Sequence, residues 1–561
     1  MGTYTNPIIP GFNPDPSITR VGKDFFLVTS TFDFFPGIPI YHSTDLIKWR
    51  LISHVLTRKS QLDIRAVEIG GGVWAPTIRY RTAQQEGKAA DEGGAFYVCG
   101  SCFDRYRPQA DERIWPRGWY AKCKERDIWD GMGSGWSELV YFDMVGFDQD
   151  LFWDDDSGDV YLSSTYRMHD RTPVPTGAKP LKDFAVHICK VDLSTGRCLT
   201  RPRLLRSSPS GIAEGSHIIK RGSYYYLFTA EGGTEDGHSE YVSRSKSGPL
   251  GPWESGGKIV GSGTGPEDEV QNTGHCDLVE DADGNWWAVL LAVRPRKRPD
   301  GTWEPSVFGR ETFLIPVTWR DDWPILNNNE RISLVGNAPG LYQHAEATTW
   351  RDDFADGNGM QLGWYRKSTP QKVDWSLTER PGWLRLWGAP YSLNTAVCST
   401  TWLRKQTQAE TTFETRIDFR PDSNRVEAGL VVWLNHTCFS SVGIRLADGK
   451  GCRRVVSLSL ADGRKITQPL ATADSEVLLV VQCGSEYRFG YREIGSDSRI
   501  RYVGSICNSS MLKEPDVGVI FTGMMVGLYA FGEWEAALVP ADFAYAKFRP
   551  NSVDNEPNKA V

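Results

Sequence analysis

The chain has 561 residues, more than one ordinary hydrophobic core accommodates, which predicts two or three domains. Its formal net charge is -7 with both signs interspersed, and it has no lysine and arginine cluster, which argues against a nucleic acid partner. No apolar run has the length needed to span a bilayer, which argues against a membrane partner.

The N-terminus, residues 1–7, has no charged region followed by a hydrophobic one. Two localisations are therefore open: a protein that stays in the cytoplasm, or a secreted one whose signal peptide has been removed. The eleven cysteines are scattered, a poor match to a disulfide scaffold. Cys99 and Cys102 form a C-x-x-C pair without a second pair at zinc-ribbon spacing, so we predict no metal site there. The sequence gives no indication of the oligomeric state.

One unit repeats through the N-terminal part: a small or acidic opening residue, a short apolar strand, a turn containing glycine and an aromatic-rich strand. Its five copies open at Asp15, Ala75, Asp148, Glu214 and His275. The openings lie about 60 to 73 residues apart, a spacing that suits a four-stranded blade with elaborated loops. We therefore predict an all-β chain that begins with a five-bladed β-propeller over residues 1–331.

The repeat ends near Arg331, and the glycine and proline residues that follow predict a linker over residues 332–351. From 352 to 549 short apolar strands alternate with turns, a pattern typical of a β-sandwich. Residues 550–561 are polar, and we predict that they form a loose tail.

The opening residues carry the chemistry. Equivalent positions of the blades converge on the axis of a propeller, so these residues are predicted to ring one end of the central channel. A single aspartate at a strand start is usually a turn residue, but Asp15, Asp148 and Glu214 share one phase of the repeat. Gathering three carboxylates and the His275 imidazole costs desolvation free energy that a purely structural protein has little reason to incur.

Such a ring suits hydrolysis of a glycosidic bond. That reaction needs one carboxylic acid to protonate the leaving oxygen, and one carboxylate that either attacks the sugar or activates water. A third acidic group beside the acid raises its pKa by repulsion and keeps it protonated near neutral pH. The ring supplies all three groups.

Several stretches also resemble a known family. They are residues 6–17, 35–40, 72–77, 146–148, 213–217, 309–313 and 521–523. In these motifs the chain resembles family 43 glycoside hydrolases, the xylosidase and arabinofuranosidase group. The resemblance covers most of the chain. It implies an exo-acting enzyme that releases D-xylose or L-arabinofuranose, or both, from xylan, arabinoxylan or their oligosaccharides.

By this resemblance Asp15 is the general base, Glu214 is the general acid, and Asp148 tunes and orients the acid. The family inverts anomeric configuration, so Asp15 is expected to activate water across a carboxyl gap of roughly 6.5–9.5 Å. Arg310 matches an arginine that contacts sugar hydroxyls, although it also suits an ion pair with Glu311 or Asp321.

His275 matches the family's axial histidine, which in some members is close to a bound calcium ion. The alternative is that His275 is only hydrogen-bonded in the channel and binds no metal, and no cofactor is required. Phe34 and Trp74 match family positions near the sugar pocket, and the small Ala75 beside Trp74 is predicted to leave room for a sugar to enter. Tyr166 is predicted at the pocket entrance. Phe521 either reaches from the sandwich towards the pocket rim or packs between the domains.

Two other classes of protein share features of this sequence. Retaining fructan and sucrose hydrolases combine a propeller with a sandwich, but they open on Asn-Asp-Pro-Asn, whereas this chain has Asn13-Pro14-Asp15-Pro16 and no Arg-Asp-Pro triplet in the third-blade region. A carbohydrate-binding propeller without catalysis is the second alternative. The three carboxylates at one repeat phase argue against it.

Overall fold

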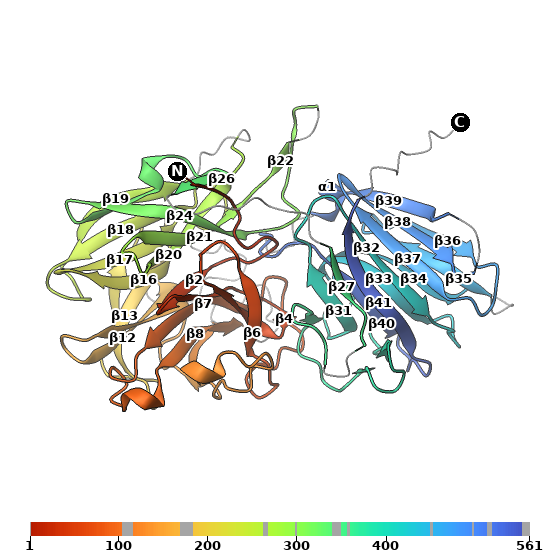
Figure 1. Cartoon of the computed structure of the whole chain (residues 1–561), viewed down its shortest axis with the longest axis horizontal. Helices are drawn as coiled ribbons and strands as arrows, with labels where there is room; N and C mark the ends of the chain where they lie inside the picture. Colours follow the sequence, from red (N-terminus) through yellow and green to blue (C-terminus); the bar gives the residue numbers. More distant parts are fainter. Residues whose placement is uncertain are drawn as a thin grey trace, which may run out of the picture. The chain divides into compact units, whose positions relative to one another are not determined.

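The computed structural model describes residues 2–103, 116–168, 183–261, 268–297, 300–338, 349–355, 359–448, 453–495, 499–512 and 519–551. The chain divides into two compact units, Met1–His344 and Ala345–Val561. Antiparallel strands are the predominant regular structure of both units (Figure 1). Among the described residues, no helix has the length and the apolar character that crossing a membrane requires.

Five sheets follow one another along the first unit, and each begins with its innermost strand and adds the next strands in chain order. Blade one contains β2 (Ser17–Val21), β3 (Asp24–Val28), β5 (Gly37–Ser43) and β6 (Arg50–Leu56). Blade two contains β7 (Gly72–Arg81), β8 (Ala95–Phe103), β9 (Arg117–Lys124) and β10 (Val140–Tyr141). Blade three contains β11 (Phe147–Asp154), β12 (Asp159–Arg167) and β13 (Phe184–Asp192), with β14 (Arg197–Cys198) and β15 (Arg203–Arg206) both paired to β13.

Blade four contains β16 (Ala213–Arg221), β17 (Tyr224–Glu231), β18 (Ser239–Ser245) and β19 (Glu254–Gly261). Blade five contains β20 (Gln271–Glu280), β21 (Trp286–Val293), β24 (Glu311–Arg320) and β25 (Trp323–Leu326), and its β21–β24 connection carries the small pair β22 (Arg296–Lys297) and β23 (Trp303–Glu304). Each first strand starts at or just beside a repeat opening of the sequence. The predicted five-bladed propeller is therefore confirmed.

The two ends of the first unit close the propeller. Strand β1 (Gly2–Thr5) pairs with β26 (Val335–Ala338), and the Ile8 N–H donates to the Thr312 carbonyl of blade five at 3.0 Å. The Tyr4 hydroxyl donates to the Leu314 carbonyl at 2.8 Å. Residues 335–338, which we predicted as linker, thus belong to a strand. Their backbone N–H and C=O groups pair with those of β1, which would otherwise be an unpaired strand edge.

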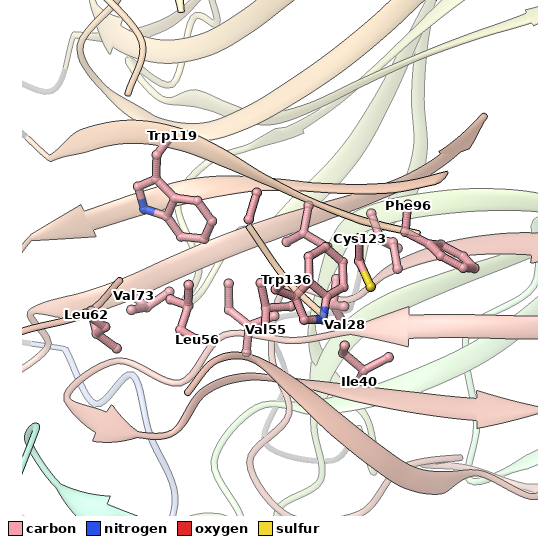
Figure 2. Close-up of a cluster of buried hydrophobic side chains, with 14 of the residues drawn as sticks. Val28, Ile40, Val55, Leu56, Leu62, Val73, Phe96, Trp119, Cys123 and Trp136 are labelled. Carbon is pink, nitrogen blue, oxygen red and sulfur yellow. The ribbon is translucent and has the colours of Figure 1, made fainter. Parts of the chain in front are cut away.

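Apolar side chains fill the space between successive blades. Along β8 the alternation of a strand sends Phe96 and Val98 to one face and Ala95 and Tyr97 to the other. The first pair packs against blade one and the second pair against blade three. Figure 2 shows the first cluster, in which Val28, Ile40 and Val55 of blade one lie with Phe96, Trp119 and Cys123 of blade two. Similar clusters join blade three to four, four to five and five to one.

The second unit consists mainly of two antiparallel sheets. One contains β29 (Trp375–Ser376), β30 (Leu384–Leu386), β41 (Ala541–Pro550), β32 (Thr411–Asp418), β37 (Val477–Cys483), β38 (Glu486–Glu493) and β39 (Arg501–Cys507), with β27 (Trp350–Asp352) on β41. The other contains β31 (Thr400–Lys405), β40 (Met525–Gly532), β33 (Val426–Asn435), β34 (Cys438–Leu446), β35 (Arg454–Ser459) and β36 (Lys465–Pro469). A single helical turn, α1 (Asn508–Met511), follows β39. This is the predicted β-sandwich; most of the predicted tail lies outside the described residues.

Candidate active site

A left-handed backbone marks the same position near the start of every blade. The residues are Asp15 (φ 55°), Ala75 (φ 34°), Asp148 (φ 54°), Gly215 (φ 57°) and His275 (φ 58°). In blades two to five the pairing with the next strand skips a step here, as a β-bulge does. Left-handed backbone is uncommon for residues other than glycine, and the strain it stores clusters at functional sites.

Blade four departs from the predicted phase by one residue. Gly215 occupies the ring position, and Glu214 precedes it, at the position that Trp74 and Phe147 hold in blades two and three. A Cβ atom at position 215 would lie 2.9 Å from Cδ2 of His275, closer than packed carbon atoms approach. The neighbouring imidazole leaves no room for a side chain at the ring position, so the chain supplies its fourth-blade carboxylate from the residue before.

Asp15 is held as a carboxylate by three side chains. Its Oδ2 accepts a hydrogen bond from Ser30 Oγ at 2.6 Å, and its Oδ1 lies 3.1 Å from an Arg310 nitrogen and 3.5 Å from His275 Nδ1. The Ala75 N–H donates to Ser30 Oγ at 2.7 Å, which orients that hydroxyl towards Asp15. Burial works to raise the pKa of Asp15, but Arg310 and His275 outweigh it and hold that pKa well below its usual range.

Glu214 and Asp148 are shifted the other way. Burial and the negative charge of Asp15 raise the pKa of Glu214 to about 7, against the opposing charge of Arg310. Burial also raises the pKa of Asp148 to about 7, opposed by His275 and reinforced by the charge of Glu214. The Gly215 N–H donates to Asp148 Oδ2 at 2.9 Å and favours the anion there. We infer that Glu214 keeps the proton near neutral pH.

Arg310 joins the ring from blade five. Besides Asp15, its guanidinium donates to Thr234 Oγ1 at 2.8 Å, and it lies 5.6 Å from the ring centre of Phe32. The adjacent Glu311 pairs instead with Arg294 at 2.5 Å. The structure thus supports a place for Arg310 beside the base and not the alternative ion pair with Glu311.

A second arginine crosses the propeller axis. Arg79 of blade two lies 2.8 Å from Asp150 of blade three and 2.8 Å from Asp277 of blade five. It also donates to His217 Nδ1 of blade four at 3.0 Å. The His217 ring lies 5.8 Å from the His275 ring. The Arg79 guanidinium therefore links blades two, three, four and five around the channel.

A calcium ion near His275 stays a prediction, and Asp15, Asp150 and Asp277 already bind other side chains. Calcium takes six to eight oxygen ligands, but the oxygens of Asp15 already face Ser30, Arg310 and His275. Asp150 and Asp277 bind Arg79. In the part of the chain that the structure describes, no group of three or more histidine, cysteine or acidic side chains is arranged to hold a metal ion. Cys99 is buried and donates to the Gln149 carbonyl.

The other predicted pocket residues lie in different settings. Trp74 is half-buried and stacks on Phe103, with ring centres 5.9 Å apart and planes at 10°. Ala75 is buried beside Ser30. Phe34, in β4 (Phe34–Phe35), is fully buried against Phe12, which does not fit a ring open to sugar.

The roles predicted for Tyr166 at the pocket entrance and for Phe521 at the pocket rim or between the domains stay predictions. Tyr166 in β12 is buried, with its ring edge on to His187 of β13. Phe521 is a half-buried residue of the second unit, just ahead of β40.

Besides Arg79, Phe32 and His217, further residues at the site were not predicted. Ser30 and Thr234 bind Asp15 and Arg310, as described above. The Nδ1–H of His238 donates to the Asn272 carbonyl at 2.9 Å, and burial lowers the pKa of His238 to about 4, so the ring is neutral. Ser30 and Thr234 lie just after the aromatic-rich second strand of their blades, where a polar run in the sequence is the available signal.

The ring therefore combines a carboxyl group whose pKa is lowered, Asp15, with one whose pKa is raised, Glu214. Asp15 is suited to accept a proton, and Glu214 is suited to donate one at the same pH. Opposed protonation states in neighbouring carboxyl groups are the requirement of general acid and base hydrolysis of a glycosidic bond.

Comparison with known proteins agrees with this chemistry. Residues 4–324 match the model of glycosyl hydrolases family 43, and residues 351–549 match the β-xylosidase C-terminal concanavalin A-like domain. A non-reducing end α-L-arabinofuranosidase of Bacteroides ovatus is 32% identical over 98% of this chain and 95% of its own. A xylan 1,3-β-xylosidase of a Vibrio species is 34% identical over 77% of each chain.

A solved structure extends the match to three dimensions. The xylan β-1,4-xylosidase of Bacillus halodurans has a TM-score of 0.83 at 28% identity, covering 97% of this chain and all of that one. Since the family model spans more than half of the chain and the arabinofuranosidase aligns with nearly all of it, the chain belongs to family 43 of the glycosyl hydrolases and is a glycoside hydrolase.

Proposed function

We propose that the protein is an exo-acting, inverting glycoside hydrolase that releases D-xylose, L-arabinofuranose or both from xylan, arabinoxylan or their oligosaccharides. The observation that carries the proposal is the contrast between two carboxyl groups in one ring. Arg310 and His275 contact Asp15 and lower its pKa, whereas burial and the charge of Asp15 raise the pKa of Glu214. The choice of xylose and arabinofuranose as the released sugars rests on the names of the relatives, which include xylosidases and an arabinofuranosidase.

The reaction uses one water molecule and moves two protons. Asp15 takes a proton from the water molecule while the water oxygen attacks the anomeric carbon. Glu214 gives its proton to the glycosidic oxygen while the glycosidic bond breaks. Inversion follows because water enters from the face opposite to the leaving group. Asp15 ends protonated and Glu214 ionised, and proton exchange with solvent restores both.

The neighbouring residues hold these two states apart. Arg310 and His275 stabilise the anion of Asp15, whereas burial and the negative charge of Asp15 oppose loss of the proton from Glu214. We propose that the reaction needs no metal cofactor, and that Arg79 balances the charges of Asp150 and Asp277 in the channel.

The acid and base assignments are tested by Glu214→Gln and Asp15→Asn, each assayed on aryl xylosides and arabinofuranosides. Each variant is expected to lose at least about 10²-fold in kcat, the usual contribution of general acid or base catalysis. Near-native turnover in either would show that the assigned residue does not carry that step. Following the anomer of the first product by NMR checks the second feature, because a retained configuration contradicts water activation by Asp15.

The released sugar is tested separately. The protein is incubated with xylo-oligosaccharides and with arabinoxylan, and the monosaccharide is identified by chromatography. Xylose, arabinose or both are expected as the first products. Release of fructose from sucrose or fructan in a parallel reaction would instead favour the retaining hydrolase alternative.

A further inference from the structure

The second unit has a hollow of about 690 Å³ that is lined entirely by its own residues. Three tryptophans contribute to the lining: Trp375 of β29, Trp387 just after β30, and Trp534 in the connection from β40 to β41. We call these three residues the tryptophan platform. None of them belongs to the carboxylate ring, and the proposed hydrolysis does not use them.

Trp534 of the platform and two aliphatic side chains beside it are exposed to an extent that their residue types rarely show, whereas Trp375 and Trp387 are half-buried. Trp534 is 70% exposed, Val373 in the same lining is 82% exposed, and the nearby Leu538 is 76% exposed. In the described part of the second unit, these are the three most exposed large hydrophobic side chains. Apolar side chains gathered at one place on a surface mark a binding site.

The backbone at Trp534 is strained in a way that presents the indole. Its φ of 61° is left-handed, which is disfavoured for a bulky residue. The Trp534 N–H donates to the Pro390 carbonyl at 3.0 Å, and the Gly532 N–H donates to the Ala389 carbonyl at 2.7 Å. These bonds fix the turn to the segment that follows β30. Strain that the surroundings maintain around an exposed aromatic ring favours a role in binding.

The rings are also positioned before any ligand arrives. Tyr391 lies edge-on to Trp534, with ring centres 6.1 Å apart and planes at 89°. Trp375 packs edge-on against the buried Trp402 at 5.2 Å. The backbone N–H of Trp387 donates to the Asp374 carbonyl at 3.0 Å, which fixes the backbone that carries this indole. Side chains that are already ordered lose little conformational entropy on binding, which raises affinity.

The lining favours a neutral ligand. Its charged residues are one lysine, Lys372, and two glutamates, Glu379 and Glu535, so it attracts no strongly charged ligand. Flat indole faces pack on the apolar C–H faces of sugar rings, while the charged and backbone groups nearby exchange hydrogen bonds with hydroxyls. We propose that the tryptophan platform is a second carbohydrate site, which binds a neutral polysaccharide chain without hydrolysing it. The choice of arabinoxylan as its ligand rests on the proposed function.

The test measures polysaccharide binding by the full chain. Affinity electrophoresis in gels containing soluble arabinoxylan compares two proteins. The first carries Glu214→Gln, which leaves the polymer intact, and the second carries Glu214→Gln together with Trp534→Ala. We expect the second protein to bind at least tenfold more weakly. Adding Trp129→Ala instead removes a 44% exposed tryptophan of the propeller and is expected to leave retardation unchanged. Trp534→Phe keeps an aromatic face and is expected to retain most of the binding.

Hydrolysis of an aryl glycoside is measured in parallel with Trp534→Ala alone, and an unchanged kcat/KM is expected. Equal retardation of the two Glu214→Gln proteins would overturn the proposal. So would a dimer of the wild type that Trp534→Ala dissociates, since the platform would then bind a second copy of the chain. The binding measurement does not depend on hydrolysis. If the wild type does not hydrolyse the aryl glycoside, the proposed function is contradicted, but the conclusion about polysaccharide binding is unaffected.

Discussion

The backbone N–H of Gly215 donates a hydrogen bond to Oδ2 of Asp148 at 2.9 Å. Gly215 directly follows the proposed acid Glu214, so this bond ties the third-blade carboxylate to the backbone that positions the acid. It also requires Gly215 to keep its left-handed φ of 57°, because that conformation sets the direction of its N–H.

We therefore predict that Gly215→Ala lowers kcat/KM by about 10²-fold, since the new Cβ would displace the His275 ring and with it the carboxylates by a fraction of an ångström or more. Gly222→Ala is the matched control. Gly222 has a φ of 58° in the β16–β17 turn, with nothing within 4 Å of an added Cβ. Both variants carry the same backbone strain, so equal loss of activity in the two would contradict a specific role for the His275 contact.

The pH dependence of kcat/KM is expected to follow the proton of Glu214. Activity requires Glu214 protonated, and its pKa is raised to about 7, so kcat/KM is expected to fall as the pH rises through about 7. In Asp148→Asn the repulsion between the two carboxylates is lost, which lowers the pKa of Glu214 and moves the alkaline limb to lower pH. A limb that stays in place would show that Asp148 does not tune the acid.

Arg310→Met is expected to move the opposite limb. Without the guanidinium the pKa of Asp15 rises, so the base becomes protonated at a higher pH and the acid limb of kcat/KM shifts upwards. Activity at neutral pH is expected to fall by about 10²–10³-fold, as for loss of one preorganised charge in an active site. Arg294→Met removes the adjacent ion pair to Glu311, and its acid limb is expected to stay at the wild-type pH.

Arg79→Met is expected to destabilise the propeller. It leaves the buried carboxylates of Asp150 and Asp277 without their shared cation, which costs about 3–5 kcal/mol when a buried pair is broken. Urea unfolding followed by tryptophan fluorescence measures the shift in midpoint. Arg331→Met removes an exposed pair with Asp268 and is expected to cost less than about 1 kcal/mol. A midpoint for Arg79→Met equal to that of Arg331→Met would contradict the axial role.

Chelation is expected to leave activity unchanged, because Arg79 balances the charges of Asp150 and Asp277 in the channel. Wild-type protein dialysed against EDTA and then assayed with and without added calcium should give one value of kcat/KM. A loss that calcium restores would show that a metal site exists near the ring.

The repeat in the sequence was sufficient to predict the blades, because each copy combines an opening residue with a strand and a turn at a regular spacing. It was not sufficient to place the carboxylate of blade four. Both Glu214 and Gly215 fit the opening, and the choice between them depends on a left-handed φ and on the His275 ring 60 residues later in the chain. Contacts of that kind have no local signal.

Arg79 and Phe34 illustrate the same limit. Arg79 follows the apolar Ile78 and has the local pattern of an ordinary strand residue, although its partners come from blades three, four and five. Phe34 lies in a motif shared with the family, but only the packing against Phe12 shows that its ring is enclosed. Composition and spacing in a sequence reveal how often a blade repeats. Contacts between residues of different blades depend on how the blades close into a propeller, which the local sequence does not show.

The closing of the propeller by its two ends has a consequence for biosynthesis. Asp15 and the Arg310 that keeps it ionised stand 295 residues apart, at the start and near the end of the first unit. While the chain emerges from the ribosome, the base is made long before its cation. The nascent protein is therefore expected to stay inactive until blade five has been translated and has docked beside blade one, so that the onset of activity reports completion of the ring.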